Sequence, residues 1–451
     1  MNIAVIGGGI AGLTAAWLLS RRHHVTLFER HAQPGFVASS VAVDGVRVDV
    51  PLRVFYPGYY PTLTRLYEQL GVATEPVSYA TTFTGRDGRA FFRWRNLRWG
   101  DWSVPWVMPQ DLATARSRRM ALDAWRFHRV ARAALRRDEL AGHSIGAFVQ
   151  AHGLSTEYVD GLLLPALATI ATCSTEDARH YPADVVARYV ASGLARQSVR
   201  RAVLGAEDAA TRLVAGITRV VCNARIEGLR HSDHHVDVQH QGHSTQRFDQ
   251  VVLATQANQA AALWQNPSPA EAKALAGFRY QALDVVMHRD SALMPTRPRD
   301  WSPVNARVCP EHDRPESTIW VNAVQPALRH AAPLFQTVQP QREPREDRVL
   351  GRARFERPLV DARSQKALGE LQGLQSGVQS GVQSGPHSVG RPPQRRVWLC
   401  GSYAQSGVPL LESAVRSAYD VCSAMAGAED DGAPTATQGS SSHAPADHKA
   451  C

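Results

Sequence analysis

An apolar run, a glycine-rich turn and a second apolar run follow one another within residues 1–29. Residues 3–6 are uniformly apolar, which is typical of a parallel strand buried on both faces. A helix-like stretch follows the glycines, and residues 25–28 then have the composition of a second strand. This order of strand, glycine turn, helix and strand predicts the beginning of a Rossmann-like α/β fold.

The glycines of this turn have separate mechanical roles. Gly7 allows the tight turn, Gly9 lets the backbone approach a pyrophosphate, and Gly12 lets the helix pack against the strand. The helix N-terminus offers free N–H groups and a positive dipole to phosphates. Glu29 closes the second strand, where a carboxylate accepts hydrogen bonds from an adenosine ribose. The segment therefore predicts dinucleotide binding.

A secretory signal peptide is the alternative explanation for an apolar N-terminal stretch. No basic residue precedes the apolar run, Arg21 and Arg22 follow it, and glycines interrupt it. No other segment has the ~18 uninterrupted apolar residues of a membrane span. We therefore expect a soluble, cytoplasmic protein.

Further patterns predict the other elements. They are a hairpin over 41–50 that turns at Asp44 and Gly45, helices over 61–70, 116–137, 162–171 and 203–213, β stretches at 219–222 and 235–239, and a buried parallel strand at 248–255. The repeat QSGVQSGVQSG within 371–394 predicts a flexible surface loop, and residues 428–451 lack periodicity, as in a disordered tail.

A second signature lies near the C-terminus. An apolar strand at 397–399 runs into Gly401 and Ser402, and residues 406–412 then open a helix expected over 413–425. We expect Pro409 near the start of that helix, because proline is favoured in a first turn. A second helix N-terminus thus points towards a ligand. The positive end of the helix dipole there stabilises negative charge on whatever is bound beside it.

The two terminal signatures, VIGGGIAGLTAAWLL…LFER and GSYAQSGVPLLESAV, together resemble the FAD-dependent amine-oxidase superfamily. This superfamily includes amine oxidases, protoporphyrinogen oxidase and carotenoid desaturases, and the likeness is strongest to uncharacterised FAD/NAD-binding oxidoreductases of bacteria and fungi. The segments DVPLR and LDVVMHRDSALMP add to it. The resemblance implies an α/β fold with a discontinuous Rossmann-like FAD-binding domain (1–70, 200–263 and 395–427) and an α+β substrate-binding domain (71–199 and 264–370).

The resemblance also implies FAD as cofactor and assigns its binding residues. These are Gly7, Gly8, Gly9, Ala11, Gly12, Glu29, Arg30, Ser40, Ile226, Ala254, Gly401, Ser402, Leu410 and Leu411. Two departures from the family pattern predict weaker FAD binding: the Gly-Gly-Arg-x-x-Ser motif keeps only Gly35 and Ser40, and Ser402 replaces an acid. The lysine that amine oxidases often carry near the flavin is missing from the strand around 283–288.

The implied activity is that of an FAD-dependent oxidoreductase. It removes a hydride from a C–N or C–C bond of a small amine-bearing or apolar substrate, and oxygen or a quinone reoxidises it. Arg53, Tyr56 and Tyr59 are the catalytic candidates because they follow the segment expected beside the ring. Arg53 either holds a substrate carboxylate, stabilises reduced flavin or forms an ordinary salt bridge, and the two tyrosines pack more often than they catalyse.

The sequence also gives an expectation for one polar cluster and leaves two alternative functions open. His288, Arg289 and Asp290 are expected to form a surface cluster. A membrane-associated desaturase or isomerase of lipid or isoprenoid, and a non-enzymatic protein with weak or lost FAD binding, remain alternative functions. The sequence leaves the oligomeric state open.

Composition adds charge but no metal site. The 451 residues carry a net charge of +9, almost wholly from arginine, and the six cysteines show no zinc spacing. Residues 93–137 combine arginine with tryptophan. This stretch is either a solvated helix face with tryptophan anchored in the core or a membrane-surface contact. Nucleic-acid binding is the least favoured interpretation, since no fold-level motif supports it.

Overall fold

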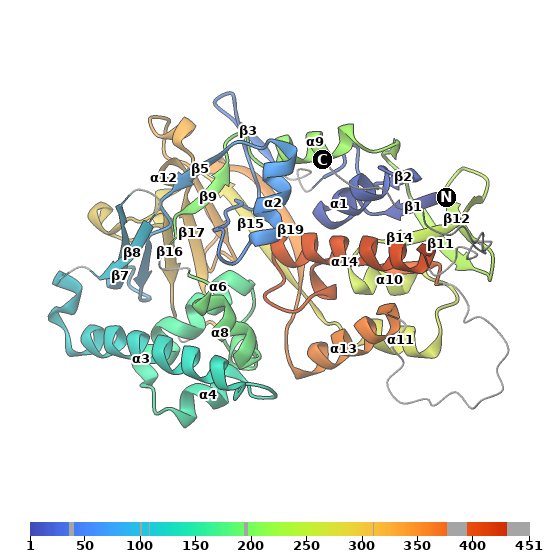
Figure 1. The fold of residues 1–451 in the computed structure, drawn as a ribbon. Coiled ribbons are helices and arrows are strands. Elements are labelled where there is room, and N and C mark those ends of the chain that lie inside the picture. The colour runs from blue at the N-terminus through green and yellow to red at the C-terminus, as the bar shows by residue number, and fades with distance from the viewer. Residues whose placement is uncertain are drawn as a thin grey trace, which may run out of the picture.

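The protein is described here from a computed structural model (Figure 1). The structure describes residues 1–35, 40–99, 102–107, 109–193, 197–309, 311–376 and 395–430. Most of the repeat, most of the C-terminal tail and residues 36–39 of the altered family motif therefore lie outside the described residues.

A parallel sheet of five strands forms one half of the molecule, with strand order β10-β2-β1-β14-β20. Alternate residues of β1 enter two different cores: Ile3 and Val5 face α1 and α14, whereas Ala4 and Ile6 face the small sheet β11-β12-β13. The sheet is thus buried on both faces, as its apolar strands predict. Its strands are β1 (Asn2–Ile6), β2 (His24–Phe28), β10 (Arg219–Val221), β14 (Gln250–Leu253) and β20 (Val397–Leu399).

Helices and a small antiparallel sheet cover the two faces of this parallel sheet. On one side lie α1 (Ile10–Leu19), α2 (Pro61–Leu70), α9 (Ala206–Ala215) and α14 (Leu411–Asp430). On the other lie β11 (Ile226–His231), β12 (Val236–His240), β13 (Gln246–Phe248), α10 (Ala257–Leu263), α11 (Pro269–Ala276) and α13 (Ala362–Ser376).

An eight-stranded mixed sheet forms the other half, in the order β19-β15-β18-β17-β16-β6-β7-β8. These strands are β6 (Thr81–Thr84), β7 (Ala90–Trp99), β8 (Trp102–Val107), β15 (Tyr280–His288), β16 (Val304–Arg307), β17 (Glu316–Trp320), β18 (Phe335–Val338) and β19 (Val349–Pro358). The hairpin of β3 (Val41–Val43) and β4 (Val46–Val48) packs on the end of the sheet formed by β15 and β19. The pair β5 (Thr74–Val77) and β9 (Val199–Ala202) is antiparallel.

A layer of helices lies beside β7, β8 and β16 in Figure 1. It contains α3 (Ala115–Arg137), α4 (Ile145–Ala151), α5 (Thr156–Tyr158), α6 (Leu164–Ala171), α7 (Thr175–Arg179) and α8 (Ala183–Ala191). A π-helical turn, η2 (Val159–Leu163), precedes α6, and α12 (Val321–Val324) follows β17. No helix in the described ranges is long and apolar enough to cross a membrane.

Most predicted elements are confirmed, and several of their boundaries differ from the prediction. Helix α9 begins only at Ala206, because the residues before it pair as β9. Helix α13 continues to Ser376, so the loop prediction is wrong for 371–376, and α14 extends to Asp430, beyond the predicted start of the tail. Pro409 lies near the start of α14 as expected, two residues before the helix begins at Leu411.

Candidate functional site

The glycine turn between β1 and α1 has the geometry that a phosphate cradle needs. Gly7 has φ of +109°, and a Cβ on Gly12 would lie 1.9 Å from the Gly7 carbonyl oxygen, so both positions require glycine. Gly9 differs, because a Cβ there would have no heavy atom within 4 Å. No side chain caps α1, whose first N–H groups lack intrahelical acceptors. The open space at Gly9 therefore adjoins free backbone donors.

Glu29 is fixed against this turn. Its side chain is buried, and Oε2 accepts a hydrogen bond of 2.7 Å from the backbone N–H of Gly8. Oε1 accepts from the His31 N–H at 2.8 Å and lies 2.6 Å from His31 Nδ1. Oε2 keeps a second lone pair with which it can accept a bond from a ribose hydroxyl. His31 was missed by the sequence analysis, although its position two residues after the acid was visible.

The segment containing Ile226 is joined to the end of β2 by backbone hydrogen bonds. The Ala224 N–H donates to the Glu29 carbonyl at 2.8 Å, and the Asn223 N–H donates to the His31 carbonyl at 2.9 Å. Ile226 begins β11 two residues later and is partly exposed. The structure thus brings the residue predicted beside the adenine to the same edge of the sheet as Glu29.

Ala254 closes the other side of the turn. Its N–H donates to the Ile6 carbonyl at 2.9 Å, and a Cβ on Gly7 would lie 2.8 Å from its carbonyl oxygen. Of the other predicted cofactor residues, Ala11 is buried in the core and Arg30 is exposed. Ser40 has a buried hydroxyl without a hydrogen-bond partner in the described structure, and it follows the residues outside the described range.

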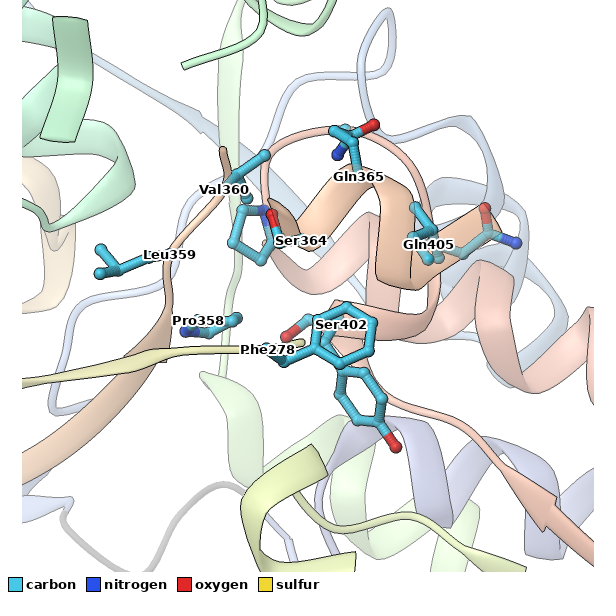
Figure 2. Close-up of a pocket in the computed structure, with 12 residues that line it drawn as sticks. Phe278, Pro358, Leu359, Val360, Ser364, Gln365, Ser402 and Gln405 are labelled. Carbon is cyan, nitrogen blue, oxygen red and sulfur yellow. The ribbon is translucent and has the colours of Figure 1, made fainter. Parts of the chain in front are cut away.

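The C-terminal segment reaches the carboxyl end of the same parallel sheet. Gly401 has φ of +152° directly after β20, and its N–H donates to the Ser417 hydroxyl at 2.9 Å. Leu410 and Leu411 are half-buried at the start of α14. Ser402 lines a small cavity with Phe278, Pro358 and residues of α13 (Figure 2). This cavity has a volume of about 10 Å³, room for about one water molecule, so it cannot accept a flavin ring.

Buried contacts tie the start of α14 to the start of α2. The Glu412 carboxylate accepts hydrogen bonds from the Thr62 N–H at 3.1 Å and the Leu63 N–H at 2.9 Å, and thereby caps α2. The Tyr59 hydroxyl accepts a bond of 2.8 Å from the Val408 N–H. Two segments 350 residues apart in the sequence are therefore held in one fixed arrangement.

The two tyrosines predicted as catalytic candidates both make structural bonds. Besides its bond to Val408, the Tyr59 hydroxyl approaches Gly407, where a Cβ would lie only 2.8 Å away. The Tyr56 hydroxyl lies 3.0 Å from the Ser192 hydroxyl and donates to the Tyr189 carbonyl at 3.3 Å. Burial raises the pKa of both phenols, so each remains protonated at neutral pH.

Arg53 stands on a loop that β18 holds in place. Gln336 accepts a bond of 2.7 Å from the Leu52 N–H and donates one of 3.0 Å to the Asp49 carbonyl. The Asp49 carboxylate caps α9 by accepting from the Ala206 N–H at 3.0 Å. Removal from water lowers the pKa of Arg53 to about 10 despite the attraction of Asp49.

A second arginine, Arg357 at the end of β19, was missed by the sequence analysis. Its guanidinium donates to the Pro409 carbonyl at 3.3 Å, and desolvation lowers its pKa. Repulsion from Arg357 also contributes to the lowered pKa of Arg53. Arg357 therefore places a desolvated cation beside the segment that begins α14, and Arg53 lies close enough to Arg357 for the two charges to repel.

The predicted surface cluster of His288, Arg289 and Asp290 is wrong. His288 is fully buried, with Nε2 2.8 Å from the Thr337 hydroxyl and Nδ1 accepting from the Asp290 N–H at 3.1 Å. Burial lowers the pKa of His288 to about 4, and Asp290 is also buried. The apolar strand before them was the signal that this end of β15 lies inside the sheet domain.

The described residues support neither a metal site nor a reactive thiol at Cys173. No group of three or more His, Cys, Asp or Glu side chains there could hold a metal ion. Cys173 is a buried free thiol whose pKa burial raises to about 12. A thiol with so high a pKa is a poor nucleophile at neutral pH.

Comparison with known proteins agrees with this geometry. A family model described as an NAD(P)-binding Rossmann-like domain matches residues 5–70. No curated protein matches the chain by sequence. Among solved structures, cyclohexylamine oxidase from Brevibacterium oxydans IH-35A superposes with a TM-score of 0.64 at 13% identity, over 96% of this chain and 99% of that one.

Two further structures have the same architecture. The CLA-producing fatty acid isomerase from P. acnes gives a TM-score of 0.63 at 14% identity, with 93% and 97% of the two chains covered. A putative protoporphyrinogen oxidase from Exiguobacterium sp. 255-15 gives 0.56 at 13% identity, with 94% and 98% covered. The chain therefore has the fold that these three solved structures share. The α/β fold class with a Rossmann-like domain and a second sheet domain is thereby confirmed.

Proposed function

We propose that the protein binds FAD and acts as an oxidoreductase on a small-molecule substrate. One observation carries the proposal: the glycine turn, Glu29 and the segment that leads into α14 follow the carboxyl ends of β1, β2 and β20, three strands of one parallel sheet. This is the edge at which open α/β sheets bind their ligands. The proposed FAD-binding domain consists of residues 1–70, 200–263 and 395–427, and the proposed substrate-binding domain of 71–199 and 264–370.

The residues at this edge suit a dinucleotide. The open space at Gly9 leaves room for a pyrophosphate beside the N–H groups of α1. Glu29 would accept a hydrogen bond from the ribose, and the backbone at Ile226 would contact the adenine. Gly401, Ser402, Leu410 and Leu411 would hold the flavin end, where Tyr59 and Glu412 fix the backbone.

When bound, FAD would supply a hydride acceptor. Loss of a hydride from a C–H bond and of a proton from the neighbouring N–H or C–H bond would convert a C–N bond of the substrate to C=N, or a C–C bond to C=C, and oxygen or a quinone would take up the two electrons. Arg53 and Arg357 would place positive charge near the α14 segment. In the proposed arrangement they stabilise negative charge there or hold an anionic group of the substrate. Tyr56 and Tyr59 then act by packing and by fixing the backbone, since both hydroxyls are already bonded.

A lipid-directed desaturase or isomerase is the second candidate. The observation in its favour is the TM-score of 0.63 to a fatty acid isomerase, close to that of the amine oxidase. The three lysines lie at positions 273, 366 and 449, none of them on β15, which weakens the case for amine oxidation specifically. A substrate panel must therefore contain amines and unsaturated fatty acids.

The test is the visible absorption spectrum of the purified protein after incubation with FAD and gel filtration. We expect retained flavin bands that disappear when the correct substrate is added without oxygen. Product analysis then separates oxidation from double-bond isomerisation, which leaves no net change in flavin oxidation state. A protein that retains no flavin contradicts the proposal and favours the non-enzymatic alternative.

A further inference from the structure

The outer face of α3 carries one continuous row of exposed side chains. At about 100° per residue, the positions i, i+4, i+7, i+11, i+14 and i+18 fall within an arc of about 80°. The opposite face packs inward through Met120, Phe127 and Ala131. In Figure 1, α3 lies along the edge of the helical layer. We call this row the α3 stripe: Arg118, Leu122, Trp125, Arg129, Arg132 and Arg136.

The α3 stripe carries positive charge that no nearby carboxylate neutralises among the described residues. It contains no acidic residue, and the helix's single carboxylate, Asp123, is buried on the inner face and bonded to Arg126. No stripe arginine has a carboxylate within 4.0 Å among the residues that the structure describes. The Arg118 guanidinium donates to the carbonyls of Leu112 and Ala113, which are neutral. Four positive charges therefore face solvent along one line.

Two large apolar side chains stand within the same stripe. Leu122 is 56% exposed and Trp125 is 55% exposed, so the expectation that tryptophan here anchors in the core is wrong for Trp125. Arg129 lies 4.6 Å above the Trp125 ring. A second exposed apolar pair, Leu97 and Trp106, stands on the β7–β8 hairpin that leads into α3. Each pair exposes two large apolar side chains to water, and apolar surface that is rimmed by polar residues is typical of protein or membrane contact sites.

We propose that the α3 stripe docks the protein on the surface of an anionic lipid bilayer. Arginines attract acidic headgroups, while Trp125 and Leu122 can enter the interfacial region between them. A nucleic acid would use the same charges but offers a leucine little apolar surface. A lipid surface accounts for both the arginines and the apolar side chains of the α3 stripe. This inference does not depend on the proposed redox function.

The experiment is co-sedimentation of the full chain with phosphatidylcholine vesicles, with and without phosphatidylglycerol. We expect binding only to vesicles that contain phosphatidylglycerol, and a decrease with added salt. The triple variant R129Q/R132Q/R136Q should lose about 100-fold in affinity, from a contribution near 1 kcal/mol per basic residue. A matched triple, R22Q/R219Q/R329Q, removes the same charge from exposed positions outside α3 and should bind like the wild type.

A second variant separates lipid insertion from simple charge attraction. L122S/W125S keeps every arginine and should weaken vesicle binding by at least about tenfold, because two apolar side chains no longer enter the interface. Unchanged melting curves confirm that each variant is folded. Equal losses in the two arginine triples, or full binding by L122S/W125S, would overturn the proposal. So would tight binding of duplex or single-stranded DNA that the stripe variants abolish while vesicles are not bound.

Discussion

Glu412 ties the start of α14 to the start of α2, and its removal tests that link. The side chain is buried, and its two oxygens accept hydrogen bonds from the backbone N–H groups of Thr62 and Leu63. Each bond to a charged acceptor contributes roughly 1.5–3 kcal/mol, and part of this is recovered if water enters. We therefore expect Glu412→Ala to lower the free energy of unfolding by about 2–4 kcal/mol.

Urea unfolding followed by circular dichroism measures this loss. Glu412→Gln keeps one acceptor but turns an amide N–H towards a backbone donor, so its cost should be about half that of the alanine variant. Glu68→Ala is the control, because Glu68 is exposed on α2 and its loss should change stability by less than about 0.5 kcal/mol. An alanine variant at position 412 as stable as the wild type would refute the capping role.

Two other predictions concern the stability of the eight-stranded sheet domain, through His288, and of the Rossmann-like domain, through Gly12. Because the pKa of His288 falls from 6.5 to about 4 on folding, the unfolded chain binds more protons between these values, and stability falls as pH drops through this window. Between about pH 7.5 and about pH 5, His288 should lower the free energy of unfolding by about 2 kcal/mol. Urea midpoints of the wild type and of His288→Asn, compared at both pH values, measure this loss. If both proteins show the same pH dependence, His288 is not its source. Gly12→Ala places a Cβ 1.9 Å from the Gly7 oxygen and should cost at least about 3 kcal/mol in the same assay. Gly427→Ala, in open space on α14, should instead stabilise by up to about 1 kcal/mol, and equal effects of the two substitutions would contradict the packing argument.

Local sequence patterns predicted local structure well. The helix Pro61–Leu70 ends at Gly71 as expected, and the hairpin turns at Asp44 and Gly45. Both depend on signals within a few residues: a proline at the first helical position, a glycine after the last, and a turn dipeptide between alternating strands. The strand 250–253 was also identified, because an uninterrupted apolar run is typical of a buried parallel strand.

The errors concern contacts between distant segments. Nothing near His288 in the sequence indicates that Thr337 faces its ring, and nothing near Glu412 indicates that it caps a helix 350 residues earlier. Of the two interpretations left open for residues 93–137, the one that anchors tryptophan in the core is wrong for Trp125, whose position on α3 faces outward. Arg357 escaped notice for the same reason, since only the folded chain brings it to Pro409.

FAD retention by the wild type and by Gly9→Val tests the central claim most directly. Gly9 has φ of −66°, which valine adopts, and a Cβ there would have no heavy atom within 4 Å, so we expect the variant to fold with an unchanged urea midpoint. That side chain would occupy the space proposed for the pyrophosphate. We predict that the wild type keeps flavin absorption through gel filtration and that Gly9→Val does not. Equal retention by both proteins, or none by either, would contradict the account.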